Sequence, residues 1–285
     1  MNVNKFSTWE EAVSWLIVQP EQQELVRACY FDRPVLSAAQ RYRQSDEWLA
    51  LRALLPTSQG TVLDVGAGMG IASYALAADG WSVTALEPDP SYLVGAGAIR
   101  QLAMEAKLLI TVVEQWGEGL PFKDASFDVV HARQVLHHAR DLRIFCKELY
   151  RVLKPGGFLF ATREHVISDK SQLPMFLAKH PLHALYGGEN AFEINEYLSC
   201  MQNAGFTISR RLGYWDSVIN FTPFTRHKLA ELFLARYGQW LGAAFISSVI
   251  FSEIGFKFGR RILALVDHRP GRLYTFIAEK PLHPL

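Results

Sequence analysis

The sequence predicts an α/β fold: a doubly wound, mostly parallel seven-stranded sheet, with an N-terminal helical cap and a helical insertion before the last strand. Three observations predict it. From Thr61 to Thr162, short β-branched runs alternate with helical segments, which is typical of βαβ units in a parallel sheet. The chain before Thr61 has a helical pattern throughout. After Thr162 the alternation loosens, and a mostly helical stretch precedes the final apolar run.

The predicted cap occupies residues 1–58. Its segment "TWEEAVSWLIV" places Trp9 and Leu16 near one helical face, and "DEWLALRALLP" does the same with Trp48 and Leu51 before it ends at Pro56. Residues 59–285 form the predicted α/β domain, with the helical insertion at about 217–268. We expect strands at 61–65, 82–87, 108–114, 127–132, 157–162, 206–214 and 271–281, and helices at Ile71–Ala78, Ser91–Ala106, Asp141–Leu153 and Glu193–Asn203.

Overall composition excludes few function classes. The 29 basic and 28 acidic residues nearly cancel, so the balance indicates neither a nucleic-acid nor a membrane-surface partner. Three cysteines without CxxC spacing favour a reducing compartment, and Glu10 and Glu11 interrupt any signal peptide, so a cytoplasmic location is expected. The segment Trp240–Phe256 is too polar for a membrane span and is interpreted as a buried helix, or else as one that contacts an apolar substrate or lies on a membrane.

A glycine-dense turn follows the first predicted strand. Glycines at 66, 68 and 70 in "TVLDVGAGMGIASYA" let the main chain approach a ligand at the edge where such sheets bind ligands. The third glycine falls one place early for a dinucleotide fingerprint. Asp64 would repel a pyrophosphate but attract an ammonium group, and Glu87 lies where an acid accepts from both ribose hydroxyls. A phosphate-free nucleoside with an amino-acid tail fits these residues, and S-adenosylmethionine is such a molecule.

Four segments carry a family resemblance: "VLDVGAGMG", "ALEPD", "GLPFKDASFDVVHARQVLHH" and "ELYRVLKPGGFLF" occur in the order and spacing of class I S-adenosylmethionine-dependent methyltransferases. The sequence resembles the group that includes quinone-biosynthesis and other small-molecule enzymes, firmly over Thr61 to Thr162. The resemblance implies a Rossmann-like fold and S-adenosylmethionine as cofactor. Trp116 stands where family members usually have an adenine-binding Asp, so it either stacks on the base or is structural. The implied cofactor-binding residues are Asp64, Gly66, Ala67, Gly68, Glu87, Pro88, Trp116, Gly117, Ala132 and Arg133.

Methyl transfer needs alignment above all, and a base only for some acceptors. Candidates for that base or for an orienting group follow the fourth and fifth strands: His138 in "LHH", and Glu164 and His165 in "TREH". Other polar residues gather around "YGGEN", where a loop could bind a polyhydroxylated substrate or be a plain connection. No pair of residues has a zinc-motif spacing, so no metal is expected.

The predicted function is methyl transfer to a small molecule, with a slight preference for a polar, glycoside-like acceptor. A quinone or lipid-like acceptor and a non-catalytic S-adenosylmethionine-binding protein stay open as alternatives. A nicotinamide-dependent oxidoreductase is disfavoured by the loop spacing. A nucleic-acid substrate is disfavoured by the neutral charge and by "HARQ" after the fourth strand, and the sequence does not indicate an oligomeric state. Tyr30, Phe31 and Tyr42 in the cap belong either to the core or to an aromatic lid over the sulfonium.

Overall fold

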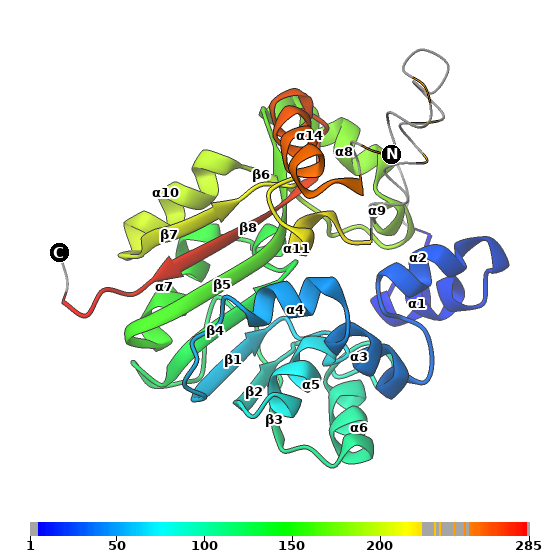
Figure 1. Ribbon diagram of the computed structural model, residues 1–285. Coiled ribbons are helices and arrows are strands. Elements are labelled where there is room, and N and C mark those ends of the chain that lie inside the picture. The colour runs from blue at the N-terminus through cyan, green and yellow to red at the C-terminus, as the bar shows by residue number, and fades with distance from the viewer. Residues whose placement is uncertain are drawn as a thin grey trace.

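The computed structural model describes residues 5–223 and 251–283, together with residues 231, 234, 242 and 248. A mixed sheet lies at its centre, with strand order β3-β2-β1-β4-β5-β8-β7 and a two-residue strand, β6, paired with β5 (Figure 1). Among the described strands, all pairings are parallel except those of β8 with β5 and β7. The strands are β1 Thr61–Val65, β2 Ser82–Leu86, β3 Ile110–Val113, β4 Phe127–Arg133, β5 Leu153–Ile167, β6 Phe192–Glu193, β7 Thr207–Leu212 and β8 Arg272–Glu279.

This topology confirms the predicted fold class, with β6 added to the seven expected strands. The chain runs outward from β1 through β2 to β3, and then returns to pair β4 with the other side of β1. The strand order therefore reverses between β1 and β4. Open α/β sheets bind their ligands beyond the carboxyl ends of the strands at such a point. The turn after β1 and the segment after β4 should consequently form the site.

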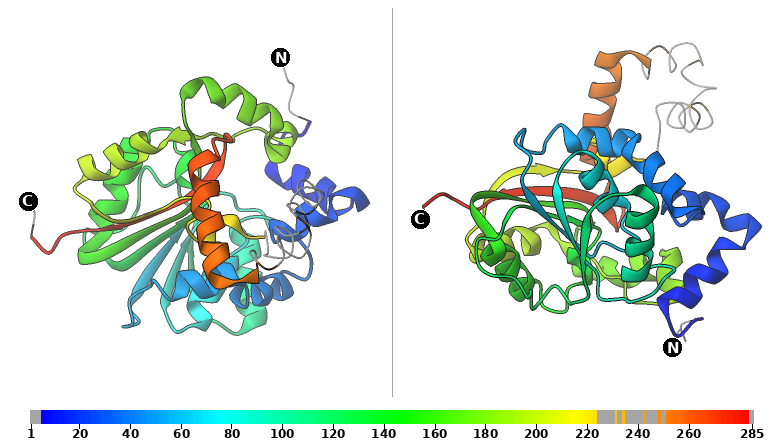
Figure 2. Two further views of the ribbon diagram at one scale, coloured as in Figure 1. Left: turned by 45° about the horizontal axis from the view of Figure 1, so that its top comes forward. Right: turned by 90° about the horizontal axis from the view of Figure 1, so that it is seen from below.

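Helices cover both faces of the sheet (Figure 2). On one face, Phe145 and Leu149 of α7 and Tyr197 of α10 pack in the core with Leu63 and Val130. On the other face lie α3, α4, α5 and α11. The helices up to β4 are α1 Trp9–Ile17, η1 Pro20–Gln22, α2 Gln23–Ala28, α3 Val35–Arg43, α4 Asp46–Arg52, α5 Ile71–Ala78 and α6 Ala96–Ala106. After β4 come η2 Leu136–His138, α7 Leu142–Val152, η3 Lys170–Gln172, α8 Leu173–Lys179, α9 Pro181–Leu185, α10 Ile194–Ala204, α11 Val218–Phe221 and α14 Glu253–Val266.

The helices before β1 share a core with the sheet. Tyr42 of α3 and Trp48 and Leu51 of α4 are buried against Val62 of β1 and Val129 of β4. Trp48 is held further by a hydrogen bond from Nε1 to the Asp79 carboxylate at 2.9 Å. The predicted cap is thus helical, as expected, and a large part of it is built into the domain beneath it. The division at residue 58 stays a prediction.

Several element boundaries differ from those predicted, and two of these differences bear on the site. The helix expected from Ser91 begins at Ala96, because Asp89 and Ser91 accept hydrogen bonds from nearby backbone N–H groups and hold the chain in a turn. The fifth strand was expected to end at Thr162 but continues to Ile167, because β8 pairs along it through Val166. Arg163, Glu164 and His165 therefore lie within a strand, not beyond one.

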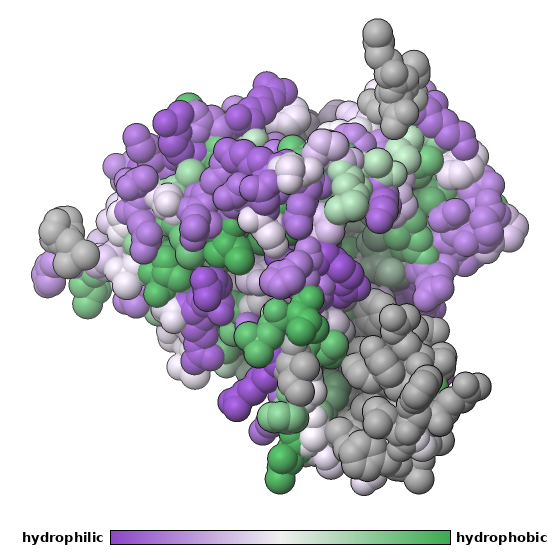
Figure 3. Space-filling view, turned by 90° about the horizontal axis from the view of Figure 1, so that it is seen from above, coloured by the Kyte–Doolittle hydropathy of each residue, from purple (hydrophilic) through white to green (hydrophobic). Residues whose placement is uncertain are grey.

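The predicted insertion is described only in part. Its flanks, α11 and α14, are helical as expected, but most of the segment Trp240–Phe256 lies outside the described residues. Helix α14 projects from the sheet (Figure 2), and Ile254, Phe258 and Leu265 on it are exposed. Figure 3 shows hydrophobic and hydrophilic residues interspersed over the face seen from above. Among the described helices, none has both the length and the apolar character needed to cross a bilayer.

Candidate functional site

The turn after β1 has the backbone that its glycines were expected to supply. Gly66, Gly68 and Gly70 have φ values of +61°, +55° and +83°, in the left-handed region that favours glycine. A Cβ at Gly66 would approach Val135 Cγ2 to 2.6 Å, so this glycine also allows the segment after β4 to pack closely. A Cβ at Gly68 would meet nothing within 4 Å. The turn is therefore packed on the side of Gly66 and open at Gly68, where a ligand could approach the main chain.

Glu87 reaches back to this turn from the end of β2. Its Oε2 accepts a hydrogen bond from the Gly68 N–H at 2.7 Å, and its Oε1 accepts one from the Asp89 N–H at 3.1 Å. The side chain is buried, and burial raises the pKa of Glu87 to about 7 despite these two hydrogen bonds. The predicted ribose-binding acid thus lies directly against the predicted cofactor turn, as its assigned role requires.

Asp64, at the end of β1, is directed into the protein. Its Oδ2 accepts from Ser73 Oγ of α5 at 2.5 Å, and its Oδ1 lies 2.8 Å from His131 Nδ1 of β4. All three side chains are buried. This arrangement ties the first helix after the turn to the two central strands. An ammonium group of a cofactor would have to share a carboxylate that already has two partners, so the predicted methionine-side role of Asp64 stays a prediction.

The other predicted cofactor residues differ in how they could reach a ligand. Ala132 is fully buried in the core, so only its main chain is available, whereas Ala67 and Pro88 are partly exposed in the two turns. Gly117 is required by packing, because a Cβ there would lie 2.3 Å from Phe145 Cε2. Trp116 is 57% exposed, with the Arg140 guanidinium 5.0 Å from its ring centroid, so its ring is accessible to a stacking partner.

Arg133 connects the site to the N-terminal helices. Its Nε donates to Glu47 Oε1 of α4 at 2.6 Å and its Nη2 donates to Oε2 at 3.2 Å, a bidentate contact. Arg163 Nη1 lies 3.5 Å from the same Glu47 carboxylate. Although burial opposes ionisation, these two guanidinium groups hold the pKa of Glu47 below its usual value. Sequence reasoning missed Glu47 because an acid beside Trp48 in an amphipathic helix is usually solvated.

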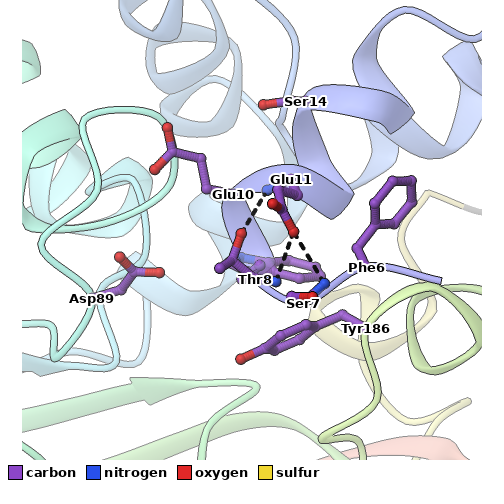
Figure 4. A pocket seen from close by; sticks show the side chains of 9 residues that line it. Phe6, Ser7, Thr8, Glu10, Glu11, Ser14, Asp89 and Tyr186 are labelled. Atoms are coloured by element: carbon purple, nitrogen blue, oxygen red, sulfur yellow. Dashed lines mark hydrogen bonds between the residues drawn. The ribbon is translucent and has the colours of Figure 1, made fainter. Parts of the chain in front are cut away.

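A cavity of about 700 Å³ opens between the start of α1 and the loop after β2. It lies among the start of α1, the loop after β2 and the segment after α9, with Asp89 and Tyr186 across from the α1 side chains (Figure 4). Asp89 is two residues from Glu87, so this cavity borders the predicted ribose site. Its size is typical of small-molecule sites. The lining residues are Phe6, Ser7, Thr8, Trp9, Glu10, Glu11, Ser14, Asp89 and Tyr186.

The structure brings together the histidines and acids that the sequence placed after the fourth and fifth strands. Glu164 is fully buried and accepts from the backbone N–H groups of Val135, Leu136 and His137 at 3.0–3.1 Å. Its Oε2 also lies 2.7 Å from His137 Nδ1. Burial lowers the pKa of His137, but the Glu164 and Glu189 carboxylates outweigh that effect and raise it to about 9. With these contacts, Glu164 fixes the segment after β4.

His165 and Glu189 complete this group. His165 Nδ1 lies 3.1 Å from the Gly271 carbonyl oxygen, and Glu189 Oε2 lies 3.5 Å from His137 Nε2. Burial holds the pKa of His165 well below its usual value, so its ring is neutral near pH 7. His138 is exposed, and its Nδ1 bonds the Gly188 carbonyl oxygen at 2.9 Å. The roles predicted for His138, Glu164 and His165 in catalysis stay predictions.

Part of the chain is similar to known methyltransferases. Residues 63–161 match the family model of a methyltransferase domain. A 2-methyl-6-phytyl-1,4-hydroquinone methyltransferase of Synechocystis sp. is 35% identical over 48% of this chain and 41% of its own length. A ubiquinone biosynthesis O-methyltransferase of Methylobacterium nodulans is 30% identical over 55% of this chain and 64% of its own. The chain thus spans less than two thirds of the length of either relative.

A solved structure shows the same fold at lower identity. A putative sarcosine dimethylglycine methyltransferase from Galdieria sulphuraria has a TM-score of 0.55 and 22% identity, over 87% of this chain and 88% of its own. The matched family segment runs from β1 through the middle of β5 and contains the glycine turn, Glu87 and Arg133. Residues 63–161 therefore match a methyltransferase domain, and the chain shares the fold of this solved structure.

Proposed function

We propose that this protein transfers a methyl group from S-adenosylmethionine to a small molecule, and that the acceptor is an aromatic hydroxyl compound of the hydroquinone or catechol type. The contact between Glu87 and Gly68 supports the cofactor part of this proposal most strongly. It holds a carboxylate at the open side of a left-handed glycine turn, beside the point where the strand order reverses. Two ribose hydroxyl groups can donate to such a carboxylate.

Methyl transfer depends more on the alignment of donor and acceptor than on acid–base groups. When bound, S-adenosylmethionine would supply a methyl group to an acceptor oxygen, which would lose its hydroxyl proton in exchange, and the cofactor would leave as a neutral thioether. Holding donor and acceptor in line accounts for up to about 7–11 kcal/mol of the barrier in favourable cases. The α1 helix and the segment around Tyr186 border the cavity, which suits them to limit water at the transfer point.

The acceptor class is argued from the relatives and from the cavity. Both curated relatives named above methylate quinone precursors according to their names, and neither of the two supports the glycoside-like acceptor that the sequence had favoured. The aromatic residues in the lining of the cavity are Phe6, Trp9 and Tyr186. The ring centroids of Trp9 and Tyr186 lie 5.9 Å apart. Such aromatic walls suit a planar ring. A non-catalytic S-adenosylmethionine-binding protein remains the alternative outcome of the test.

The test is a radiolabelled methyl-transfer assay with the purified chain, S-adenosylmethionine and a panel of hydroquinones, catechols and glycosides, followed by mass spectrometry of the product. We expect label in a hydroquinone or catechol and its loss with Glu87→Ala. Glu114→Ala, which removes an exposed acid after the neighbouring strand β3, is the matched control and should keep the activity. Label in a glycoside alone would refute the acceptor class. Cofactor binding without transfer to any acceptor would refute the enzymatic proposal.

A further inference from the structure

A cluster of three potential metal ligands lies at the carboxyl ends of β4 and β5. His137 belongs to η2 after β4, His165 belongs to β5, and Glu189 follows α9. One ligand atom from each of these residues lies within 4.8 Å of the other two. Around a bound Zn²⁺ the bonds are about 2.0–2.2 Å long, so its ligand atoms lie roughly 3–4 Å apart. Small side-chain shifts would therefore bring these three atoms onto one ion.

The Nδ1 atoms of both rings have hydrogen-bond partners outside the cluster, which leaves Nε2 of each ring available as a ligand. His165 Nδ1 must donate its proton to the Gly271 carbonyl oxygen, since that oxygen can only accept. His137 Nδ1 is likewise directed at the Glu164 carboxylate, which three backbone N–H groups hold in place. Metal-binding histidines almost always have such a carboxylate or carbonyl partner on their other nitrogen. The partners of both rings therefore match those of metal ligands.

Charge and hydrogen bonding at Glu189 point in the same direction. Its Oε2 atom is buried and has no hydrogen-bond partner among the described residues. Glu164 and Glu189 bring two carboxylates to opposite nitrogens of the buried His137 ring. A single protonated imidazole would balance only one of these charges, whereas a divalent cation on His137 Nε2 would balance both. Buried charges without a balancing partner are costly.

We propose that His137, His165 and Glu189 bind one divalent transition-metal cation, with Glu164 as the group that positions His137. Two imidazoles and one carboxylate form a ligand set typical of Zn²⁺, and they leave at least one coordination position for water or another oxygen ligand. Near this group, His180 Nδ1 lies 3.9 Å from Glu189 Oε1. The site stands apart from the methyl-transfer proposal, because it is argued from the ligand geometry alone. It departs from the sequence expectation of no metal.

The test is a titration of the full chain, freed of any affinity tag and of metal, with Zn²⁺ in competition with a chromophoric chelator. We expect one equivalent to bind. Glu189→Gln should weaken binding by more than the roughly 10- to 100-fold that loss of an outer partner costs. His268→Gln, which changes an exposed histidine in another loop, is the matched control and should bind like the wild type. Absence of saturable binding, or equal affinity in Glu189→Gln, would overturn the proposal.

A spectroscopic measurement on the wild-type chain keeps the proposal testable if a variant fails to fold. Co²⁺ in a site of nitrogen and oxygen ligands should give visible ligand-field bands and no thiolate charge-transfer band. A thiolate band would assign the metal to Cys29, Cys146 or Cys200 and overturn the proposal. In parallel, Zn²⁺ should raise the Tm of the wild type and leave that of His165→Gln unchanged, because an ion that binds only the folded state stabilises it.

Discussion

Replacement of Glu47 by Ala should strongly destabilise the fold. The substitution removes the carboxylate that Arg133 contacts at 2.6 and 3.2 Å and that Arg163 approaches to 3.5 Å. The exposed side-chain fractions are only 2% for Glu47, 19% for Arg133 and 9% for Arg163, so solvent screens the interaction weakly. Removal of one partner from a buried ion pair typically costs about 3–5 kcal/mol, because the remaining charge stays buried without compensation. We expect a loss in the free energy of unfolding within that range.

The assay is urea unfolding followed by circular dichroism, with Glu21→Ala as the control. Glu21 is an exposed acid on the N-terminal helical segment, and its substitution should change the free energy of unfolding by less than about 0.5 kcal/mol. In an Arg133→Met background, Glu47→Ala should cost measurably less than in the wild type, since one buried guanidinium is gone. Equal effects of Glu47→Ala and Glu21→Ala would refute the reasoning.

Three further predictions use the cofactor turn and its acids. Gly66→Ala should lower the free energy of unfolding by about 2–4 kcal/mol, because the new side chain is strained in the left-handed region and overlaps Val135. Gly68→Ala should lower it by only about 1–2 kcal/mol, because it adds backbone strain without overlap. Equal losses in urea unfolding would contradict this. Because the pKa of Glu87 is raised to about 7 in the fold, its contribution to stability is fully present below about pH 4.5 and is lost as the pH rises to about 7. Relative to Glu87→Gln, the wild type should therefore lose about 3 kcal/mol across that window, and parallel pH profiles would disprove the shift. Asp64→Asn should cost about 1–3 kcal/mol in thermal unfolding, because Asp64 accepts two buried side-chain hydrogen bonds, and an unchanged Tm would exclude that role.

Much of the fold was predictable because its signals are local. The strand and helix periods from Thr61 to Thr162 and the glycine turn place each element from residues near one another in the chain. The late start of α6 comes from local hydrogen bonds of Asp89 and Ser91, whereas the end of the fifth strand depends on a distant partner. The fifth strand continues to Ile167 because β8, more than 100 residues later, pairs with it, and no local pattern records that pairing.

The site, like the fold, was predictable where its residues follow from local sequence patterns, and not where they meet through distant packing. The three glycines follow β1 and Glu87 follows the neighbouring strand β2. Because both strands are predicted from local patterns, the proximity of Glu87 to the glycine turn follows from the sequence. The Glu47–Arg133 contact and the approach of Glu189 to His137 join residues 86 and 52 positions apart, through packing of separate elements. The hydrogen bonds of individual side chains could not be predicted either. Nothing in the sequence indicates that Glu164 accepts four of them.

The most direct test of the account is isothermal titration calorimetry of S-adenosylmethionine binding to the wild type and to Glu87→Ala. We predict one cofactor bound per chain, and binding weaker by about 1–3 kcal/mol, roughly 5- to 150-fold, in the variant, since two ribose hydrogen bonds to the Glu87 carboxyl group are lost. Absence of cofactor binding by the folded wild type, or equal affinity in the variant, would contradict the account.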